Sequence, residues 1–423
     1  MPTDWKTAIA NEWNARAASR PPQTGFPLVA QGFDSEEIVS IVDSLLSGRL
    51  TMDSQVAEFE QVFARWVGAP YACFVNSGSS ANLLAVAVAS NPARAKHFLP
   101  GDEVLVPAVC WSTSVWPILQ MGLKPVFVDV DPHTLNVTVA DLERRITPRT
   151  RGMVAVHILG NCADLDRIQE LAIKHDWIWI EDTCESLGSR YRDKALGTFS
   201  SFGTYSFYYS HHITTGEGGV VVCQTLEDYD LLRCLRAHGW SRLLSDRVQI
   251  EERHSDIDPR FLFVNVGYNL RPMEVQAAMG LCQMRRVDQM NQNRIVNRNN
   301  LVSALQAHPK WDGQFEFTQA TAQAVPSWFG FPALLREDLV SHLRPFLSFL
   351  SARGIENRPI VSGNFTRQPA LALHSVDCNP LDYPGAERVH HTGFFIGVHT
   401  DLLEPLRLAE IADALLSYDF SSV

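Results

Sequence analysis

Apolar and polar stretches alternate along this chain in a way that predicts its architecture. Short apolar runs are separated by longer segments whose apolar residues recur at helical spacing, as do Val56, Phe59 and Phe63. Near-continuous apolar strands between helices are typical of a parallel sheet that is buried on both faces. Strands are predicted at residues 71–75, 103–106, 125–130, 152–158 and 177–181, and helices at 35–46, 53–67, 113–121, 139–145, 165–175 and 226–237.

The same pattern divides the chain into three parts. Residues 1–30 are polar, contain Pro21-Pro22 and are predicted to form an irregular arm. A large domain is expected over 31–290, with Ser35 as the N-cap of its first helix and a surface loop over 241–260. One long helix is predicted over 274–307, with the domain boundary inside it. A small α/β domain is expected over 291–423, with strand and helix signals at residues 328–335, 339–353, 358–361, 394–398 and 403–418.

Composition narrows the class of protein. The chain has 423 residues, of which 46% are hydrophobic and 20% are charged, as in a globular protein of one or two domains. A formal net charge of -11 argues against a nucleic-acid or anionic-membrane partner. We expect no signal peptide and no membrane span, since no apolar run reaches about 18 residues. Eight cysteines without CxxC or CxC spacing predict reduced thiols in a cytoplasmic enzyme.

Two segments carry candidate chemistry in the first half of the chain. Ser77-Gly78-Ser79 lies between a predicted strand and a predicted helix, where free N–H groups and hydroxyls can bind an anion. The alternative is an ordinary serine N-cap. Asp182 ends an apolar strand, and ligands of open α/β sheets bind beyond the carboxyl ends of strands.

The most unusual stretch is residues 206–219. It reads as a short aromatic strand, two histidines (His211 and His212) and a glycine-rich turn that allows a ligand to approach the backbone closely. Lysine is scarce in the chain, and none lies between Lys194 and Lys310. A metal site at the two histidines is a weaker alternative, because adjacent side chains on a strand diverge and no acidic or thiol partner is suggested nearby.

Taken in order, the motifs at 77–79, 182, 206–219 and 267–269 resemble those of the sugar-nucleotide aminotransferases. The resemblance covers about residues 30 to 420 and implies a fold-type I α/β transferase that uses pyridoxal 5'-phosphate (PLP). It implies a large domain with a mostly parallel seven-stranded sheet and a small C-terminal domain. That family has a lysine at position 211, which binds PLP as a Schiff base, whereas this chain has His211. The histidine is similar to that of the PLP-dependent sugar 3-dehydratase branch.

The resemblance implies a role for each site residue. Asp182 would pair with the pyridine nitrogen, Trp111 would stack on the ring, and Glu185 would lie beside the cofactor. Gly78, Ser79 and Ser206 would hold the phosphate, with Asn269 reaching it from the neighbouring subunit of a homodimer that shares its active sites. Substrate binding is expected of His238, Arg242 and Arg271, whose arginine forks suit carboxylates and phosphates.

His211 is the expected catalytic residue. Imidazole forms no stable Schiff base, so PLP or its amine form, pyridoxamine 5'-phosphate (PMP), would be bound non-covalently. Imidazole titrates near neutrality, at a pKa of roughly 6.5, and can therefore take and return a proton.

The reaction implied is 3-dehydration of a nucleotide-linked 4-keto-6-deoxy sugar, with GDP-4-keto-6-deoxy-D-mannose favoured and L-glutamate regenerating PMP. A sister branch binds an iron–sulfur cluster through four cysteines, including a CxC in the loop after the active-site strand. Residues 241–260 contain no cysteine, so we expect no cluster and no reductase partner.

Two alternative functions follow from the same residues. A true sugar aminotransferase would need a lysine near the ring, and neither Lys194 nor Lys310 lies in a suitable motif. A non-catalytic PLP-binding regulatory protein is disfavoured by the presence of Asp182, Trp111 and the phosphate-site residues.

Overall fold

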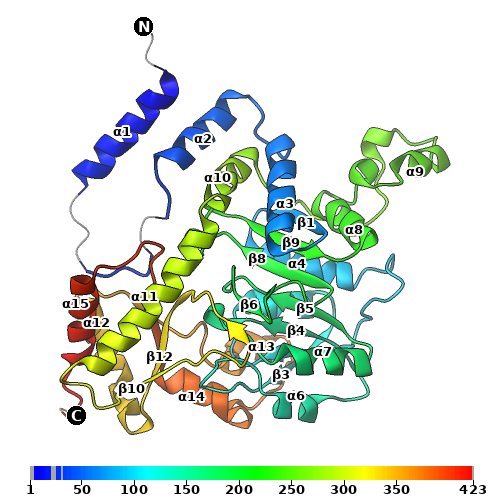
Figure 1. Cartoon of the computed structure of the whole chain (residues 1–423). Coiled ribbons are helices and arrows are strands. Elements are labelled where there is room, and N and C mark those ends of the chain that lie inside the picture. Colours follow the sequence, from blue (N-terminus) through cyan, green and yellow to red (C-terminus); the bar gives the residue numbers. More distant parts are fainter. Residues whose placement is uncertain (1–3, 21–24, 30–31, 422–423) are drawn as a thin grey trace.

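A seven-stranded sheet forms the centre of the molecule (Figure 1). The computed structural model describes residues 4–20, 25–29 and 32–421. Only β9 runs antiparallel to its neighbours, and the remaining strand pairs are parallel, as predicted. In sheet order, the strands are β1 (Tyr71–Val75), β9 (Gly219–Cys223), β8 (Phe202–Ser206), β5 (Ile178–Asp182), β4 (Thr150–Val156), β2 (Glu103–Pro107) and β3 (Lys124–Val128).

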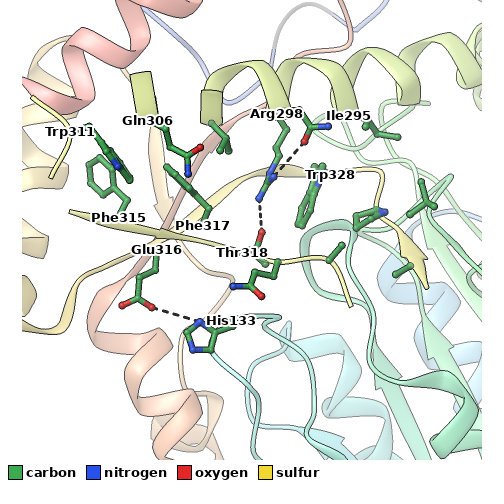
Figure 2. A pocket seen from close by; sticks show the side chains of 17 residues that line it. His133, Ile295, Arg298, Gln306, Trp311, Phe315, Glu316, Phe317, Thr318 and Trp328 are labelled. Carbon is green, nitrogen blue, oxygen red and sulfur yellow. Dashed lines mark hydrogen bonds and ion pairs between the residues drawn. The ribbon is translucent and has the colours of Figure 1, made fainter. Parts of the chain in front are cut away.

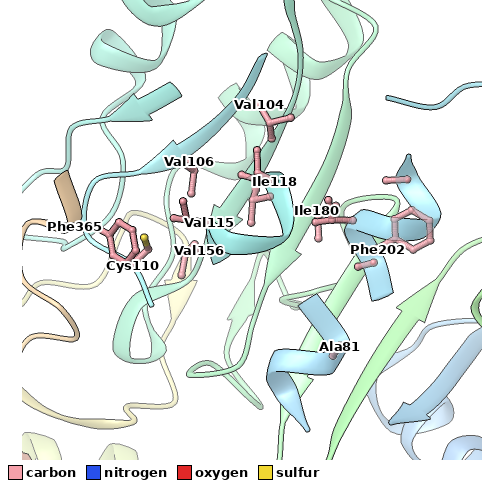
Figure 3. Packing of buried hydrophobic residues seen from close by; sticks show 14 of the residues in the cluster. Ala81, Val104, Val106, Cys110, Val115, Ile118, Val156, Ile180, Phe202 and Phe365 are labelled. Carbon is pink, nitrogen blue, oxygen red and sulfur yellow. The ribbon is translucent and has the colours of Figure 1, made fainter. Parts of the chain in front are cut away.

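The sheet is buried on both faces, which explains why its strands are apolar throughout. Val104 and Val106 of β2 pack into one core, whereas Leu105 between them packs into another. Figure 3 shows the first of these cores, where Val106 lies near Val115 and Val156. The helices that cover the sheet include α4 (Gly78–Ala89), α5 (Trp116–Gln120), α6 (Val139–Arg145), α7 (Leu165–Lys174) and α8 (Leu226–Arg236).

A second, antiparallel sheet lies in the C-terminal part of the chain, which has its own hydrophobic core. Its order is β10 (Phe315–Phe317), β12 (Gly330–Leu335), β14 (Gly393–Gly397) and β13 (Asn357–Pro359). Packed with it are α11 (Val287–Ala307), α12 (Leu343–Ala352) and α15 (Pro405–Leu416). A third, small sheet pairs β6 (Arg190–Tyr191) with β11 (Ala324–Val325) on one side and with β7 (Lys194–Ala195) on the other, and so joins the two parts of the chain. The boundary near residue 290 stays a prediction; that position falls inside α11.

The N-terminal segment differs from the prediction. Instead of an irregular arm, residues Trp5–Ser19 form α1, which begins after Asp4, whose side chain accepts from Lys6 N. The alanine-rich sequence favours a helix, and the Lys6 ammonium binds Asp43 of α2 (Ser35–Leu46) at 2.9 Å. Pro21 and Pro22, which suggested irregular structure, lie outside the described residues.

The predicted helix over 274–307 is two helices. α10 (Glu274–Met284) ends before Arg285, and α11 starts at Val287. Arg286, at the break, donates to the carboxylates of Asp34 and Glu37 at the start of α2, so long-range ion pairs override the local pattern.

Two smaller predictions are also wrong. Asp34 rather than Ser35 is the N-cap of α2, through a capping box with Glu37, and the loop over 241–260 contains α9 (Arg247–Arg253).

The described part of the chain contains no helix long and apolar enough to cross a membrane. All eight cysteines are free, and all but Cys184 and Cys378 are buried.

We predict that Glu274→Ala lowers the free energy of unfolding by about 2–3 kcal/mol. The buried Glu274 carboxylate accepts from Asp53 N at 2.8 Å, Gln55 N at 2.9 Å and Val56 N at 3.0 Å, all at the start of α3 (Ser54–Val67). Charged hydrogen bonds to free helix N–H groups are among the stronger ones. Denaturant titration would measure the loss, with the exposed Glu227→Ala as a control. Equal stability of the two variants would contradict the capping role.

Candidate functional site

A cavity of about 380 Å³ opens at the carboxyl ends of β5 and β8. It brings together residues that are distant in sequence, from the start of α4, the turn after β2, and the segments that follow β5 and β8. The predicted site residues that line it are Gly78, Ser79, Trp111, Asp182, Glu185, Ser206 and His211.

One end of the cavity is built to bind an anion. Ser77 caps α4 by accepting from Ser80 N at 3.1 Å, so the backbone N–H groups of Gly78 and Ser79 lie in the first helical turn without helical acceptors. Any side chain at Gly78 would collide with Ser206, which brings the Ser206 hydroxyl against the helix start. A helix N-terminus with a neighbouring hydroxyl fits a phosphate group.

Asp182 is buried in the cavity wall and held by three donors. Its Oδ2 accepts from Asn82 Nδ2 at 2.7 Å and from Ser114 Oγ at 2.6 Å, and its Oδ1 accepts from Cys184 N at 3.2 Å. Thr204 of β8 in turn donates to Asn82 Oδ1 at 2.5 Å. The carboxylate is therefore fixed from several elements at once.

Trp111 presents an indole to the cavity. Its side chain is 56% exposed even though the adjacent Cys110 is fully buried. An exposed aromatic face in a cavity of this size is suited to stacking on a flat ring.

His211 lies in the loop after β8, in a turn closed by the bond from its backbone N–H to Tyr208 O at 2.9 Å. Its Nδ1 is 2.7 Å from the Cys184 carbonyl oxygen, which can only accept, so Nδ1 carries the proton and Nε2 has a free lone pair. Burial lowers the pKa of His211 to about 4; the Cys184 carbonyl and Asp182 oppose this shift, and the Arg294 cation adds to it. The ring contacts Phe329 edge-on, with 5.0 Å between centroids.

Glu185 has the opposite electrostatic character. Burial raises the pKa of its carboxyl to about 7; the Leu159 N–H, donating to Oε2 at 3.0 Å, opposes this, and the nearby Asp182 adds to it. Near pH 7 the cavity thus contains a neutral histidine and a partly protonated carboxyl. The histidine can then act as a base and the carboxyl as an acid.

His212 points away from the cavity and is fully buried. Its Nε2 donates to Ser327 O at 2.8 Å, and burial holds its pKa well below the usual range. The side chain has a packing role, which agrees with the expectation that the two adjacent histidines diverge. Among the described residues, no group of three or more side chains is arranged to hold a metal ion.

Four predicted residues do not line this cavity. Asn269, His238, Arg242 and Arg271 cluster around Trp240 instead. The rings of His238 and Trp240 are 4.8 Å apart, and the Arg242 guanidinium lies 4.3 Å from the indole. Arg271 Nε donates to Asn269 Oδ1 at 3.0 Å.

Sequence reasoning missed Asn82 and Ser114, which orient Asp182. A signal existed for Asn82, because it lies one helical turn after Gly78 and so shares a face with the helix start. No local pattern singles out Ser114, whose role arises only when β5 and the turn after β2 meet.

The cavity fits PLP as a non-covalent ligand. It offers an anion corner, an exposed indole and a fixed carboxylate, and none of the six lysines of the chain (Lys6, Lys96, Lys124, Lys174, Lys194 and Lys310) lines it. Its volume is within the range of small-ligand sites.

Comparison with known proteins identifies the family of the chain. Residues 32–415 match the DegT/DnrJ/EryC1/StrS aminotransferase family. The chain belongs to this family. Within it, the chain is 38% identical over 386 residues to GDP-4-keto-6-deoxy-D-mannose 3-dehydratase of Yersinia pseudotuberculosis, covering 90% of this chain and 96% of the relative. The dehydratase of Escherichia coli O55:H7 is 36% identical over 376 residues, covering 88% and 95%.

A solved structure of a GDP-4-keto-6-deoxymannose-3-dehydratase with a trapped PLP-glutamate geminal diamine has the same fold. It superposes with a TM-score of 0.84 at 34% identity, covering 92% of this chain and 100% of that one. The predicted family, fold type and PLP dependence of this DegT/DnrJ/EryC1/StrS member are therefore confirmed.

We predict that Asn82→Ala weakens PLP binding about tenfold. Without Asn82, Asp182 loses one of its donors and its fixed orientation, and one such hydrogen bond to a charged group contributes roughly 1.5–3 kcal/mol. Equilibrium dialysis against PLP would measure the change, and thermal unfolding of the apo form would report separately on stability. Unchanged affinity would show that Asp182 orientation has no part in cofactor binding.

The low pKa of His211 predicts that its imidazole stays neutral at pH 5. An unfolded histidine gains its proton near pH 6.5, whereas folded His211 gains it near pH 4. Stability therefore falls as pH drops between these values, because only the unfolded state binds the proton there. Imidazole nitrogen NMR would follow the titration, assigned with His211→Asn, and that variant should lose less stability over this range. Titration near 6.5 would contradict the prediction.

Proposed function

We propose that this protein catalyses the PLP-dependent 3-dehydration of GDP-4-keto-6-deoxy-D-mannose to the 4-keto-3,6-dideoxy sugar, with L-glutamate as the amino donor. The observation that carries this proposal is His211 in a cavity with no lysine. Support comes from relatives over nearly the whole chain that are named as this dehydratase, one of them with PLP and glutamate trapped together.

The cofactor would be held by the residues described above. The N–H groups of Gly78 and Ser79 and the Ser206 hydroxyl would bind the phosphate, Trp111 would stack on the ring, and Asp182 would pair with the pyridine nitrogen. When bound, PMP supplies the amine that condenses with the sugar ketone and the electron sink that lets the C3 hydroxyl leave.

His211 then moves the proton. Because Nδ1 is committed to the Cys184 carbonyl, only Nε2 can exchange protons in the cavity. A neutral imidazole would accept at Nε2 the proton given up by the cofactor's methylene carbon after condensation with the sugar, and would return it to the C3 hydroxyl, which leaves as water. The edge-on contact with Phe329 limits the rotation of the ring, so the same atom faces the substrate in both steps.

Glu185 adds less than a full negative charge to the cavity. With a pKa near 7, its carboxyl carries a proton part of the time and can donate a hydrogen bond to the cofactor or the sugar. A permanently charged carboxylate beside Asp182 would repel it.

A sugar aminotransferase needs an amine that returns a proton to the sugar carbon. The cavity offers no lysine for this step, which is why dehydration is proposed instead. A non-catalytic regulatory role leaves the opposed pKa values of His211 and Glu185 without a purpose.

We further propose that the protein works as a homodimer. The cluster of Asn269, His238, Arg242 and Arg271 lies outside its own chain's cavity, and Phe261, Phe263 and Val266 nearby are exposed apolar side chains. In a dimer, the cluster of one subunit would complete the cavity of the other, with Asn269 on the phosphate and the basic groups on the substrate. A cytoplasmic location stays a prediction, in keeping with eight free thiols.

The assay uses purified protein with PLP, L-glutamate and GDP-4-keto-6-deoxy-D-mannose, with products measured by mass spectrometry. We expect a sugar product lighter than the substrate by one oxygen atom, because a hydrogen replaces the C3 hydroxyl, together with 2-oxoglutarate and ammonia from glutamate. A product that gains an amino group and keeps its C3 hydroxyl would overturn the proposal in favour of an aminotransferase.

We predict that His211→Lys abolishes dehydration and bonds the cofactor covalently. A primary amine reacts with the PLP aldehyde, whereas imidazole forms no stable bond. Borohydride reduction followed by peptide mass spectrometry should find the cofactor on residue 211 in the variant and on no lysine in the parent chain. Full dehydratase activity in the variant would refute the role of His211.

A further inference from the structure

A second cavity shares none of the lining residues of the catalytic one. We call it the α11 groove: about 650 Å³ bounded by one face of α11, by β10 and by the segment 318–328 (Figure 2). Nothing in the proposed reaction uses it.

Arg298 is an incompletely satisfied cation in this groove. It is half-buried, and burial lowers its pKa to about 10. No carboxylate among the described residues pairs with it: Nη2 donates to the Thr318 carbonyl at 2.5 Å, Nη1 has a long contact of 3.5 Å with Asn299, and Nε has no partner. The guanidinium lies 4.6 Å from the Trp328 ring. A partly desolvated cation of this kind favours an anion.

The carboxylate of the groove is already neutralised. Both oxygens of Glu316 accept from Arg388 Nη2 at 2.6 Å, and His133 lies 3.8 Å away. In Figure 2 the Glu316 side chain points toward His133 and away from Arg298. Glu316 therefore does not cancel the charge of Arg298.

The other end of the groove is aromatic. Trp311 and Phe317 stack with ring centroids 5.3 Å apart and an interplanar angle of 12°, and both are half-buried. Gln306, near the end of α11, also lines the groove. Its exposed amide can form hydrogen bonds with the polar edge of a ring. Flat apolar walls with an amide suit a nucleobase.

We propose that the α11 groove binds a nucleoside phosphate, with its base on Trp311 and Phe317 and its phosphate on Arg298. The volume is within the range of ligand sites and exceeds what a phosphate alone would need. This site is separate from the catalytic cavity and does not depend on the proposed reaction.

A ligand here would touch the segment that also supports the catalytic histidine. Trp328 faces the groove, whereas its neighbours face the other way: Ser327 O accepts from His212, and Phe329 contacts His211. Arg294, one turn before Arg298 on α11, donates to the carbonyls of Trp328 and Phe329. The groove is thus placed to act as an effector site.

The test is hydrogen–deuterium exchange of the full-length holoenzyme with and without GDP. We expect GDP to protect residues 295–306 and 311–320, separately from any protection near 77–80 and 206–212 at the catalytic site. Arg298→Gln should weaken groove binding tenfold or more and leave catalytic-site protection unchanged. Arg16→Gln, an exposed arginine of α1 paired with Glu12, is the matched control.

Further experiments identify the ligand chemistry. Trp311→Ala should also weaken groove protection by GDP, because it removes an aromatic wall. Guanosine at the same concentration should give no protection, because it lacks the phosphate, and GDP-mannose shows whether the groove accepts a nucleotide sugar as well as free nucleotide. Absence of groove protection by both GDP and GDP-mannose, or protection by GDP that persists equally in both Arg298→Gln and Trp311→Ala, would overturn the proposal. Neither result bears on the dehydratase assay, so the two proposals fail independently.

Discussion

The site depends on one buried carboxylate that has no cation to balance it. Asp182 ends the central strand β5, and Asn82, Ser114 and the Cys184 N–H hold it. Neutral donors orient a charge but leave it uncompensated, and a buried charge is costly until an opposite one arrives. The uncompensated charge lies where a protonated ring nitrogen would supply the opposite charge. The helix start at Gly78 and the indole of Trp111 are then spaced around that point.

Much of this arrangement could be predicted from local sequence. The apolar strands, the turn before α4 and the acidic end of β5 are short-range features, and they were enough to predict the sheet and the carboxylate. Features that depend on contacts between distant segments are seen only in the structure. Asn82 and Ser114 acquire their role only through contact with Asp182, and the break between α10 and α11 depends on carboxylates at the start of α2. The helix α1 differs from the prediction because Pro21 and Pro22 suggest irregular structure, whereas the alanine-rich sequence before them favours a helix.

The roles assigned to Asn269, His238, Arg242 and Arg271 rest on a different kind of information. A single chain places them around Trp240 and apart from the cavity. Such residues can be recognised from a resemblance, but geometry within one subunit cannot bring them to the cofactor. They remain predictions about an assembly, whereas His211 and Glu185 are placed by the chain itself.

Arg294 has a wider consequence. This buried guanidinium donates to the backbone carbonyls of Trp328 and Phe329, and its field disfavours a proton on the imidazole of His211. The same field would disfavour a proton on any basic group at that position, including a primary amine, and an uncharged amine is the nucleophilic form. A lysine at position 211 would therefore meet the same field as the imidazole, and that field would favour its reactive, uncharged form.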